Sequence, residues 1–334
     1  MKLDSVRELK AGLIESVVVP LSSSHVIRSA GLRAGPVSGL AAKPPSIALG
    51  VGRRAKGDYV LAVRLQKRAL EKSGHVESIR KKAKGEVDVR YIGSVVKRAV
   101  APPSRQRRTR PMKIGISIGH FKITAGTLGG FVRDRKDGTV YVLSNNHVLA
   151  DENRGKKGDA ILQPGVFDGG ANPADKVGSL ARFVRLKKIG ANLVDCAVAT
   201  IDVGTDFDPK ALVGIGDLAG LGPDFVDEGE ELRKVGRTTG LTKGTVTAFE
   251  LDNLMVQYDL GTLRFDNQME IEGTGSGPFS QGGDSGSLIV DGRRLAVAQL
   301  FAGGDIGGHN GQGLTYVTPL HAVLDKLKVD LHIG

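Results

Sequence analysis

Apolar and polar residues alternate with different spacings in the two halves of this chain of 334 residues. Over residues 2–19 apolar side chains recur mostly every three or four positions, which predicts an amphipathic helix. Two apolar runs, at 46–51 and 59–65, flank a charged turn bounded by glycines, a pattern that predicts a β-hairpin. A short basic helix over 77–83 and a strand over 87–95 complete a predicted α+β unit.

The second half alternates short apolar segments with glycine-containing turns. We predict strands at 130–132, 140–144, 192–201, 232–235, 244–249, 254–258, 287–290, 295–301 and 314–317, and one helix at 319–328. Short strands at this spacing favour an all-β sandwich or barrel over a βαβ protein. The glycine distribution supports many tight turns in this half, because 37 of the 47 glycines lie in residues 113–334.

Charge divides the chain at the same place. Residues 1–112 carry 24 Lys and Arg against 8 Asp and Glu, a net charge of +16, whereas residues 113–334 carry 23 against 28, a net charge of −5. The boundary segment is basic and contains three prolines, which is typical of an exposed linker. We therefore predict a basic α+β N-terminal region over 1–100, a linker over 101–112 and a mainly β domain over 113–334.

Composition excludes several classes of protein. Cys196 is the one cysteine, so a secreted scaffold held by intramolecular disulfides is excluded. No run of about 18 apolar residues could span a membrane, and Asp4, Glu8 and Glu15 interrupt the place where the apolar stretch of a signal peptide would lie. We expect a cytoplasmic protein without a membrane partner.

Three segments of the second half carry residues suited to chemistry. His147 closes the strand-like segment VYVLSNNHVL at 140–149, and Asp195 interrupts the apolar segment NLVDCAVA at 192–199. Ser285 lies between glycines in FSQGGDSGS at 279–287. An ionised carboxylate on an apolar strand is costly without a partner, so Asp195 needs a dedicated hydrogen-bond donor.

These segments resemble the trypsin-like serine peptidases of the chymotrypsin fold, over about residues 114–334. The resemblance lies in the GDSG motif at 283–286, the Asp-x-Ala segment at 195–197, and the chain order His, Asp, Ser with separations of 48 and 90 residues. The segment VGRTTGLTKGTV at 235–246 is similar to the strand, turn and strand that open the second barrel in bacterial members. The resemblance implies a double β-barrel preceded by the basic α+β region.

The resemblance also implies site residues and a reaction. His147, Asp195 and Ser285 would form the catalytic triad of a serine endopeptidase acting on a protein or peptide, with no metal or cofactor. The histidine accepts the serine proton and returns it to the leaving amine, while the aspartate orients the imidazole. Backbone N–H groups of Gly283 and Ser285 would form the oxyanion hole.

For the substrate pocket the resemblance implies Phe279 at its base, where trypsin has an aspartate, and Phe301, Ala302 and Gly303 along the edge on which a substrate strand pairs. An apolar base gives no support for Arg or Lys before the cleaved bond, so we expect an apolar or small residue there. The pocket entrance should be open because the residues after Phe301 are small.

The chain departs from the animal members of the family at several places. Asn145 and Asn146 precede the histidine where most animal members have two alanines, and the family's disulfides are absent, as in intracellular bacterial members. Animal zymogens mature by a cut whose new amino terminus pairs with the aspartate before the serine, here Asp284. A cut between Lys113 and Ile114 is one way to supply that partner, and an internal Arg or Lys is another.

Other residues compete for roles at the site. His120 is better explained as a structural histidine, whereas His309, in a glycine-rich stretch, belongs either to a loop lining the pocket or to a solvated turn. Cys196 neighbours Asp195, but a lone cysteine in an apolar strand is usually core packing, and strand alternation directs it away from the aspartate. Asp202 is a rival for the acid role but lies at the end of its strand.

The basic N-terminal region leaves three readings open. It could be a prosegment or regulatory domain that docks on the acidic peptidase half, which we favour. Its lysines and arginines could neutralise nucleic-acid phosphates, although Tyr59 and Tyr91 are its only aromatic residues. It could also be a module that docks a partner, or simply a solvated charged face. For the whole chain, the alternative to an endopeptidase is a catalytically silent scaffold that binds peptides or is tethered to nucleic acid.

Overall fold

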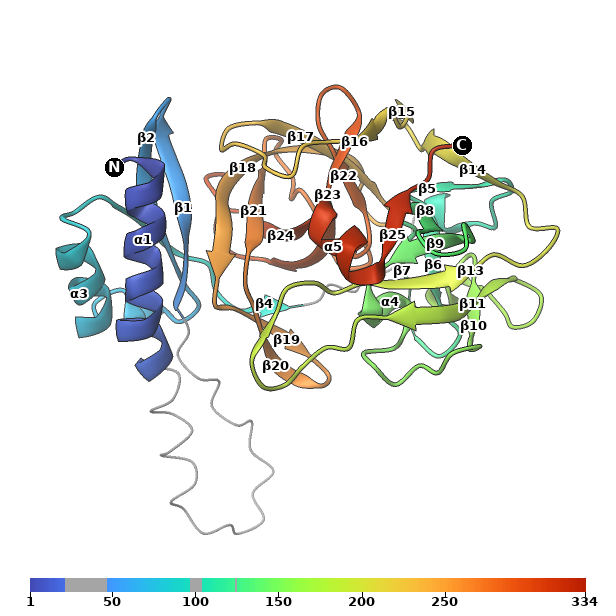
Figure 1. Cartoon of the computed structure of the whole chain (residues 1–334), viewed down its shortest axis with the longest axis horizontal. Helices are drawn as coiled ribbons and strands as arrows, with labels where there is room; N and C mark the ends of the chain where they lie inside the picture. Colours follow the sequence, from blue (N-terminus) through green and yellow to red (C-terminus); the bar gives the residue numbers. More distant parts are fainter. Residues whose placement is uncertain (22–46, 97–103, 124) are drawn as a thin grey trace, which may run out of the picture.

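The computed structural model describes residues 1–21, 47–96, 104–123 and 125–334. Residues 22–46 and 97–100 of the predicted N-terminal region, and the first residues of the predicted linker, 101–103, lie outside the described residues. The protein is mainly β, as predicted, and its strands form two barrel-like sheets side by side with a small helical unit at one end (Figure 1).

The first barrel-like sheet is built from residues 117 to 331. Its strands run in the order β25, β8, β9, β13, β11, β10, β6 and β7. In chain order they are β6 (Ser117–His120), β7 (Gly126–Thr127), β8 (Gly130–Asp134), β9 (Val140–Ser144), β10 (Ala160–Leu162), β11 (Lys176–Phe183), β13 (Ala197–Thr200) and β25 (Val329–Leu331). Alternating apolar residues such as Phe131, Leu143 and Val198 meet in its core, which α5 (Leu320–Leu327) also joins.

The second sheet runs in the order β12, β20, β19, β4, β23, β22, β17, β18, β1, β2 and β3, and β16, β21 and β24 pair alongside this path. Its strands from the second half are β12 (Ala191–Asn192), β16 (Gly220–Leu221), β17 (Glu231–Gly236), β18 (Gly240–Asp252), β19 (Leu254–Tyr258), β20 (Gly261–Phe265), β21 (Gln268–Gly273), β22 (Leu288–Val290), β23 (Leu295–Gly304) and β24 (Leu314–Pro319). The predicted strands of the second half therefore divide between the two sheets, and the strand predicted over 192–201 is broken into β12 and β13, one in each sheet.

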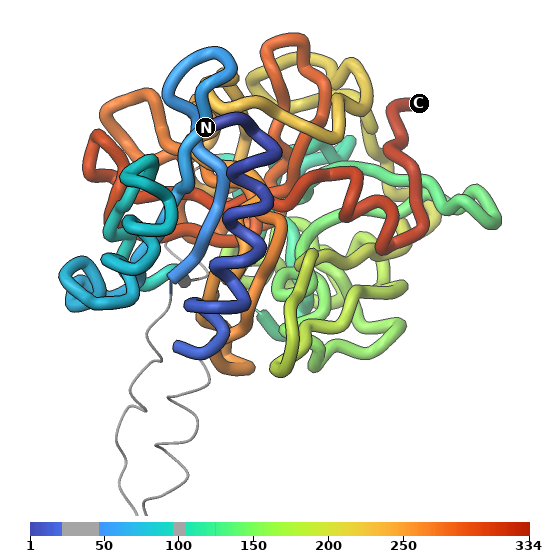
Figure 2. Tube along the Cα trace, turned by 60° about the vertical axis from the view of Figure 1, so that its left-hand side comes forward, coloured from blue at the N-terminus to red at the C-terminus, as the bar shows by residue number. Residues whose placement is uncertain are grey.

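The N-terminal elements follow the predicted order, except that the strand predicted over 87–95 is divided into two strands with different partners. They are α1 (Leu3–Leu13), which continues as a π-helical turn over Ile14–Val18, β1 (Ile47–Ala55), β2 (Asp58–Leu65), α3 (Gly74–Lys82), β3 (Val87–Tyr91) and β4 (Val95–Val96). Ser73 caps α3 by accepting from the N–H of Val76. The predicted hairpin is β1 with β2, and Figure 2 shows α1 (dark blue) lying beside this hairpin.

The N-terminal region shares its sheet and core with the second barrel. Strand β1 pairs antiparallel with β18, with Leu49 opposite Asp252. Val6 and Leu13 of α1 are buried in the same apolar cluster as Leu232 and Phe279 of the second barrel. Residues separated by more than 200 positions thus exclude water together, so the two regions stabilise one another.

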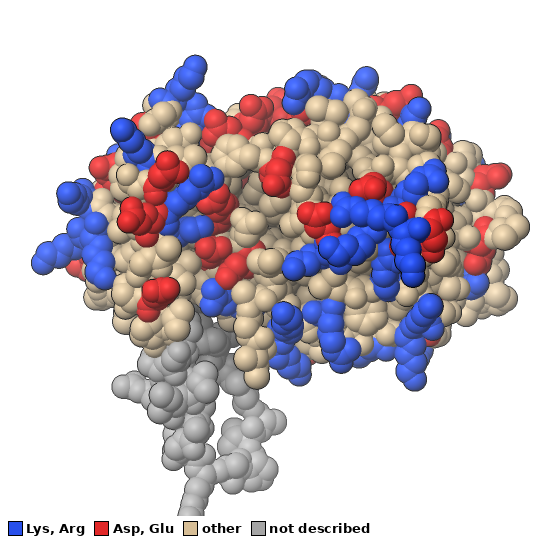
Figure 3. Space-filling view, viewed as in Figure 1, with Lys and Arg blue, Asp and Glu red and all other residues tan. Residues whose placement is uncertain are grey.

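Opposite charges face one another across this boundary. Arg7 pairs with Glu250, Lys10 with Asp252 (Nζ–Oδ2 3.0 Å) and Arg53 with Asp227 (Nη1–Oδ2 2.7 Å). Figure 3 shows acidic and basic side chains side by side on this part of the surface. Deeper in the boundary, the fully buried guanidinium of Arg64 lies 3.0 Å from the carboxylate of Glu270. Burial lowers the pKa of Arg64, but the charges of Glu270 and Asp88 outweigh it and raise the pKa above the ordinary value.

The stretch from 104 to 112 lies along the second half of the chain. Gln106, in a 3₁₀ turn over Ser104–Gln106, is buried and donates to the carbonyl of Arg237. Strand β5 (Met112–Ile114) then enters a third, small sheet with β14 (Phe207–Leu212) and β15 (Gly216–Asp217). No helix in the described part of the chain is long and apolar enough to cross a membrane.

Candidate active site

His147 and Asp195 are brought together by neighbouring strands of the first sheet. Strand β9 ends at Ser144, and the chain turns directly into the short helix α4 (Asn146–Leu149), which carries His147. Strand β13 pairs with β9, with Ala197 opposite Ser144, so Asp195 lies beside the start of α4. The imidazole Nδ1 is 2.5 Å from Oδ2 of Asp195.

The Asp195 carboxylate, 1% exposed, has four hydrogen-bond donors. Oδ1 accepts from the N–H groups of Asn146 (2.6 Å) and His147 (3.3 Å). Oδ2 accepts from the His147 ring and from the hydroxyl of Tyr258 (2.7 Å). Burial raises the pKa of Asp195, but the charge of His147 and these hydrogen bonds outweigh it and hold the pKa below the ordinary value. The sequence argument that Asp195 needs dedicated donors is therefore confirmed.

The two asparagines before His147 hold the segment in place. Asn145 donates to the backbone carbonyl of Asp195 (2.7 Å). Asn146 exchanges hydrogen bonds with Asn153 in both directions and donates to the carbonyl of Val184 (2.7 Å). Their amides therefore bind the histidine segment to the chain on either side, which alanines could not do.

Ser285 lies in the loop before β22 of the second sheet, but it contacts the first sheet. Its carbonyl accepts from the N–H of Thr127 in β7 (2.8 Å). A Cβ on Gly126 would stand 2.7 Å from a methyl of Val148 and 3.0 Å from the Ser285 carbonyl oxygen. Glycine at 126 thus allows the serine backbone to approach the residue that directly follows His147.

The loop before Ser285 contains the two N–H groups predicted for the oxyanion hole. Gly283 has φ +88°, and a side chain there would collide with the guanidinium of Arg237 and with Thr238. Within the described ranges, the N–H groups of Gly283 and Ser285 donate to no backbone carbonyl, whereas the intervening N–H of Asp284 donates to Gln281 (3.0 Å). These two N–H groups are the ones that the family resemblance assigns to the oxyanion hole, and that role stays a prediction.

Asp284 is held by an internal lysine. Its carboxylate accepts from Lys234 Nζ (3.2 Å), and neither side chain is exposed. It also accepts from the N–H groups of Thr238, Thr239 and Gln281 and from the hydroxyl of Thr239. Of the two expected partners, the internal cation is thus the one present. Ile114, which a cut would make the new amino terminus, is buried in β5.

The predicted pocket residues are all buried, and their roles at a substrate stay predictions. Phe279 is 1% exposed, packs in the second core, and has the ammonium of Lys234 5.7 Å from its ring centroid. Phe301 packs against Phe265 with ring centroids 4.7 Å apart. Ala302 and Gly303 follow in β23.

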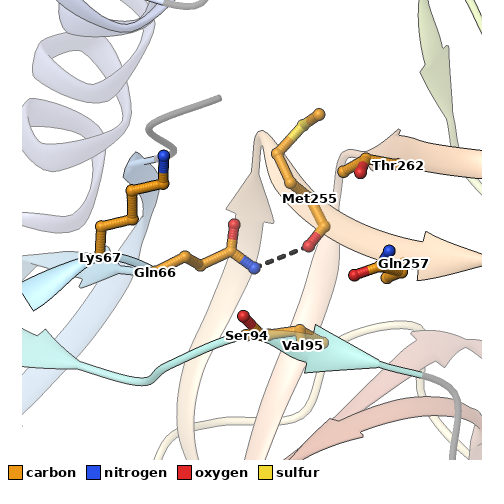
Figure 4. A pocket seen from close by; sticks show the side chains of 7 residues that line it. All are labelled: Gln66, Lys67, Ser94, Val95, Met255, Gln257 and Thr262. Atoms are coloured by element: carbon orange, nitrogen blue, oxygen red, sulfur yellow. Dashed lines mark hydrogen bonds between the residues drawn. The ribbon is translucent and has the colours of Figure 1, made fainter. Parts of the chain in front are cut away.

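The edge predicted to bind a substrate strand is covered by the chain itself. Strand β4 lies between β19 and β23, with Val96 opposite Gly303 in antiparallel register and Val95 opposite Val256 in parallel register. A cavity of about 50 Å³ remains beside β4, lined by Gln66, Lys67, Ser94, Val95, Met255, Gln257 and Thr262. Figure 4 shows Gln66 donating to the carbonyl of Met255 (2.6 Å), which links the end of β2 to β19.

The competing residues lie in other surroundings. His120 is buried and bonded to Asp159 (Nε2–Oδ2 3.0 Å), and Asp202 pairs with Lys176 (2.7 Å). His309 is on an exposed loop, with its Nδ1 2.9 Å from Glu272. Cys196 is fully buried, and burial raises the pKa of its thiol well above the ordinary value. Among the described residues, no cluster of three or more His, Cys, Asp or Glu could hold a metal ion.

Sequence reasoning missed Tyr258 and the specific donors to Asp284. Tyr258 ends an apolar strand and is separated from Asp195 by 63 residues, so no local pattern connects the two. Lys234 was foreseen only as a type of residue, although a lysine within the apolar strand over 232–235 is a signal of the same kind as Asp195.

The protein resembles solved structures of bacterial chymotrypsin-like serine proteases. They include the chymotrypsin of Cellulomonas bogoriensis and Protease A of Thermobifida fusca, each 19% identical with a TM-score of 0.46, and the Nocardiopsis protease, 17% identical with a TM-score of 0.47. Each comparison covers 66% of this chain and 98% of the solved chain. No family model and no curated protein matches the chain.

Proposed function

We propose that this protein is a serine endopeptidase in which His147, Asp195 and Ser285 act as a catalytic triad. The observation that carries the proposal is the hydrogen bond between His147 Nδ1 and the buried Asp195 carboxylate. A histidine so oriented presents Nε2 as the base, because Nδ1 keeps its proton against the carboxylate. The Ser285 loop, which approaches α4 across Gly126, supplies the nucleophile.

Each group has a step in the reaction. Ser285 attacks the carbonyl of a peptide bond while His147 takes its proton, and the imidazolium that forms is stabilised by Asp195. His147 then returns the proton to the leaving amine, and water releases the acyl group by the same route. The N–H groups of Gly283 and Ser285 donate to the developing oxyanion, and the buried pair of Asp284 with Lys234 keeps that loop fixed.

A phosphonylating serine probe tests this function. We expect a fluorophosphonate to label the wild-type protein on Ser285, and Ser285→Ala to abolish both labelling and cleavage of a casein substrate. Cys196→Ala serves as the matched control because the buried thiol has no part in the proposed reaction, and it should be labelled normally. A folded wild-type protein that is never labelled would instead support the alternative, a silent scaffold that binds peptides.

For specificity, the apolar character of Phe279 supports an apolar or small residue before the cleaved bond. A library of peptide substrates varied at that position tests this. A preference for Arg or Lys would contradict it, since a cationic side chain would be desolvated without a carboxylate to pair with.

We further propose that the N-terminal region inhibits this peptidase by occupying the substrate edge. The support is the register of β4, whose Val96 pairs with Gly303 where a substrate strand would pair. Gly304 permits the approach, since a Cβ there would stand 3.3 Å from the carbonyl of Ile92. The ion pairs at Arg7, Lys10 and Arg53 hold the rest of the basic region on the acidic half.

Two reagents that differ in whether they must bind along the substrate edge test the inhibition. A fluorophosphonate needs only the serine, whereas a tripeptidyl chloromethyl ketone must also pair along β23. We expect the intact chain to react slowly with the ketone, and Val95→Gly, which removes a buried anchor of β4, to accelerate that reaction alone. Equal rates in both proteins would refute inhibition, and salt-dependent affinity for DNA or RNA would instead favour nucleic-acid binding by the basic region.

A further inference from the structure

Tyr258 joins the second sheet to the candidate triad. It is the last residue of β19, and its hydroxyl lies 2.7 Å from Oδ2 of Asp195. Its ring is 4% exposed, stacks on Phe265 at 5.9 Å and meets the His147 ring edge-on at 5.8 Å. Packing alone therefore restrains the Tyr258 ring, and the hydrogen bond to Asp195 adds to this restraint.

The hydroxyl acts on the oxygen that faces the histidine. Oδ2 of Asp195 accepts from both Tyr258 and His147, while Oδ1 accepts only backbone N–H groups. Two donors on each oxygen define the rotation of the carboxylate about its Cβ–Cγ bond. Burial, followed by the charge of Asp195, raises the pKa of Tyr258 well above the ordinary value, so the phenol keeps its proton and donates.

We propose that Tyr258 is a positioning residue for the triad, which orients Asp195 toward His147 and shares the negative charge of its carboxylate. The proposal rests on the endopeptidase function proposed above. Tyr258 also follows Gln257, which pairs with β4, so the strand that borders the predicted substrate edge carries the residue that holds the aspartate.

Tyr258→Phe removes the hydroxyl and keeps the ring. We expect kcat for a peptide substrate to fall about tenfold with little change in KM, because the lost hydrogen bond orients a catalytic group and binds no substrate. The carboxylate, no longer sharing its charge with the phenol, would stabilise the imidazolium more strongly. The acid limb of the kcat/KM profile should therefore move to higher pH by a few tenths of a unit.

Tyr316→Phe is the matched control. Tyr316 is also buried, and its hydroxyl donates to the carboxylate of Glu270 (3.3 Å), away from His147. A purely structural effect of losing a buried phenol would appear in both variants, whereas the shift of the acid limb should appear only in Tyr258→Phe.

The outcomes separate this inference from the proposed function. Cleavage by Ser285→Ala would overturn the endopeptidase itself. An inactive Ser285→Ala together with an unchanged kcat and pH profile in Tyr258→Phe would overturn only the role of Tyr258. If Tyr258→Phe is too unstable for kinetics, the low-field NMR signal of the His147 Nδ1 proton gives a second readout at low temperature. We expect the substitution to shift it, and an unshifted signal would overturn the role.

Discussion

Lys234 and Asp284 form an ion pair that is completely closed to solvent, with Nζ 3.2 Å from Oδ2. The aspartate directly precedes Ser285, so the pair fixes the loop that would carry both the nucleophile and the oxyanion hole.

Removing the lysine should therefore damage both stability and activity. Lys234→Met leaves the Asp284 charge buried without its cation, which should lower the free energy of unfolding by about 3 kcal/mol. Urea unfolding measures this, and labelling by a fluorophosphonate should slow in parallel. In the control Lys176→Met, the lost pair with Asp202 is partly exposed, so the change should stay within about 1 kcal/mol. Equal losses in both variants would contradict the prediction.

Asn146 should matter for activity because its side-chain amide holds the segment that carries His147. Asn146→Ala breaks the paired hydrogen bonds with Asn153 and leaves the partly buried carbonyl of Val184 without this donor. We expect a loss of about 2 kcal/mol in stability and a fall in kcat/KM on the order of 10²-fold, because His147 is the next residue. Thermal unfolding and peptide hydrolysis test this, with the exposed Asn172→Ala as control. Full activity in a destabilised Asn146→Ala would show that the hydrogen bonds of the Asn146 side chain do not position the histidine.

Glu228 should make stability depend on pH above neutrality. Burial raises the pKa of Glu228 to about 8 in the folded protein, against an ordinary value of 4.5. The folded state therefore holds a proton that the unfolded state has released, and this stabilisation is complete below pH 4.5 and is lost as the pH rises through about 8. Because Glu228 is only partly buried, we expect a modest effect.

The comparison of Glu228→Gln with wild type isolates this group. The amide cannot ionise, so the fall in Tm between pH 6 and pH 9 should be smaller in the variant than in the wild-type protein. Glu230→Gln, exposed on the same turn, should behave like wild type. A wild-type Tm that falls no more steeply than that of Glu228→Gln would contradict the assignment.

Cys196 should be inert in the folded protein. Burial, with the charge of Asp195 adding to it, raises the pKa of the thiol well above the ordinary value, so little thiolate is present at pH 8. We expect iodoacetamide to modify Cys196 only after unfolding in guanidinium, as mass spectrometry can measure. Rapid modification of the native protein, with loss of serine labelling, would show instead that the thiol is open to the site.

Local patterns were sufficient to predict much of this protein. Nearly continuous apolar runs mark strands such as β9 and β23, which are buried along almost their whole length. The segments around His147, Asp195 and Ser285 could be singled out because each places a potentially reactive residue among a few distinctive neighbours in the sequence. The helix α1, the hairpin of β1 with β2, and the need of Asp195 for donors follow from the same kind of short-range reasoning.

The partners of these elements could not be predicted in the same way. Nothing near Tyr258 in the chain indicates that its hydroxyl reaches Asp195, and nothing in β4 indicates that it lies between β19 and β23. Strand β1 pairs with β18, some 200 residues away, although its own pattern fits any sheet with a buried face. The sequence by itself indicated many of the strand segments and the residues suited to chemistry, because these signals lie in single residues and their near neighbours. Only the tertiary structure decided which distant segments meet, because that choice depends on the packing and hydrogen bonding of the whole chain at once.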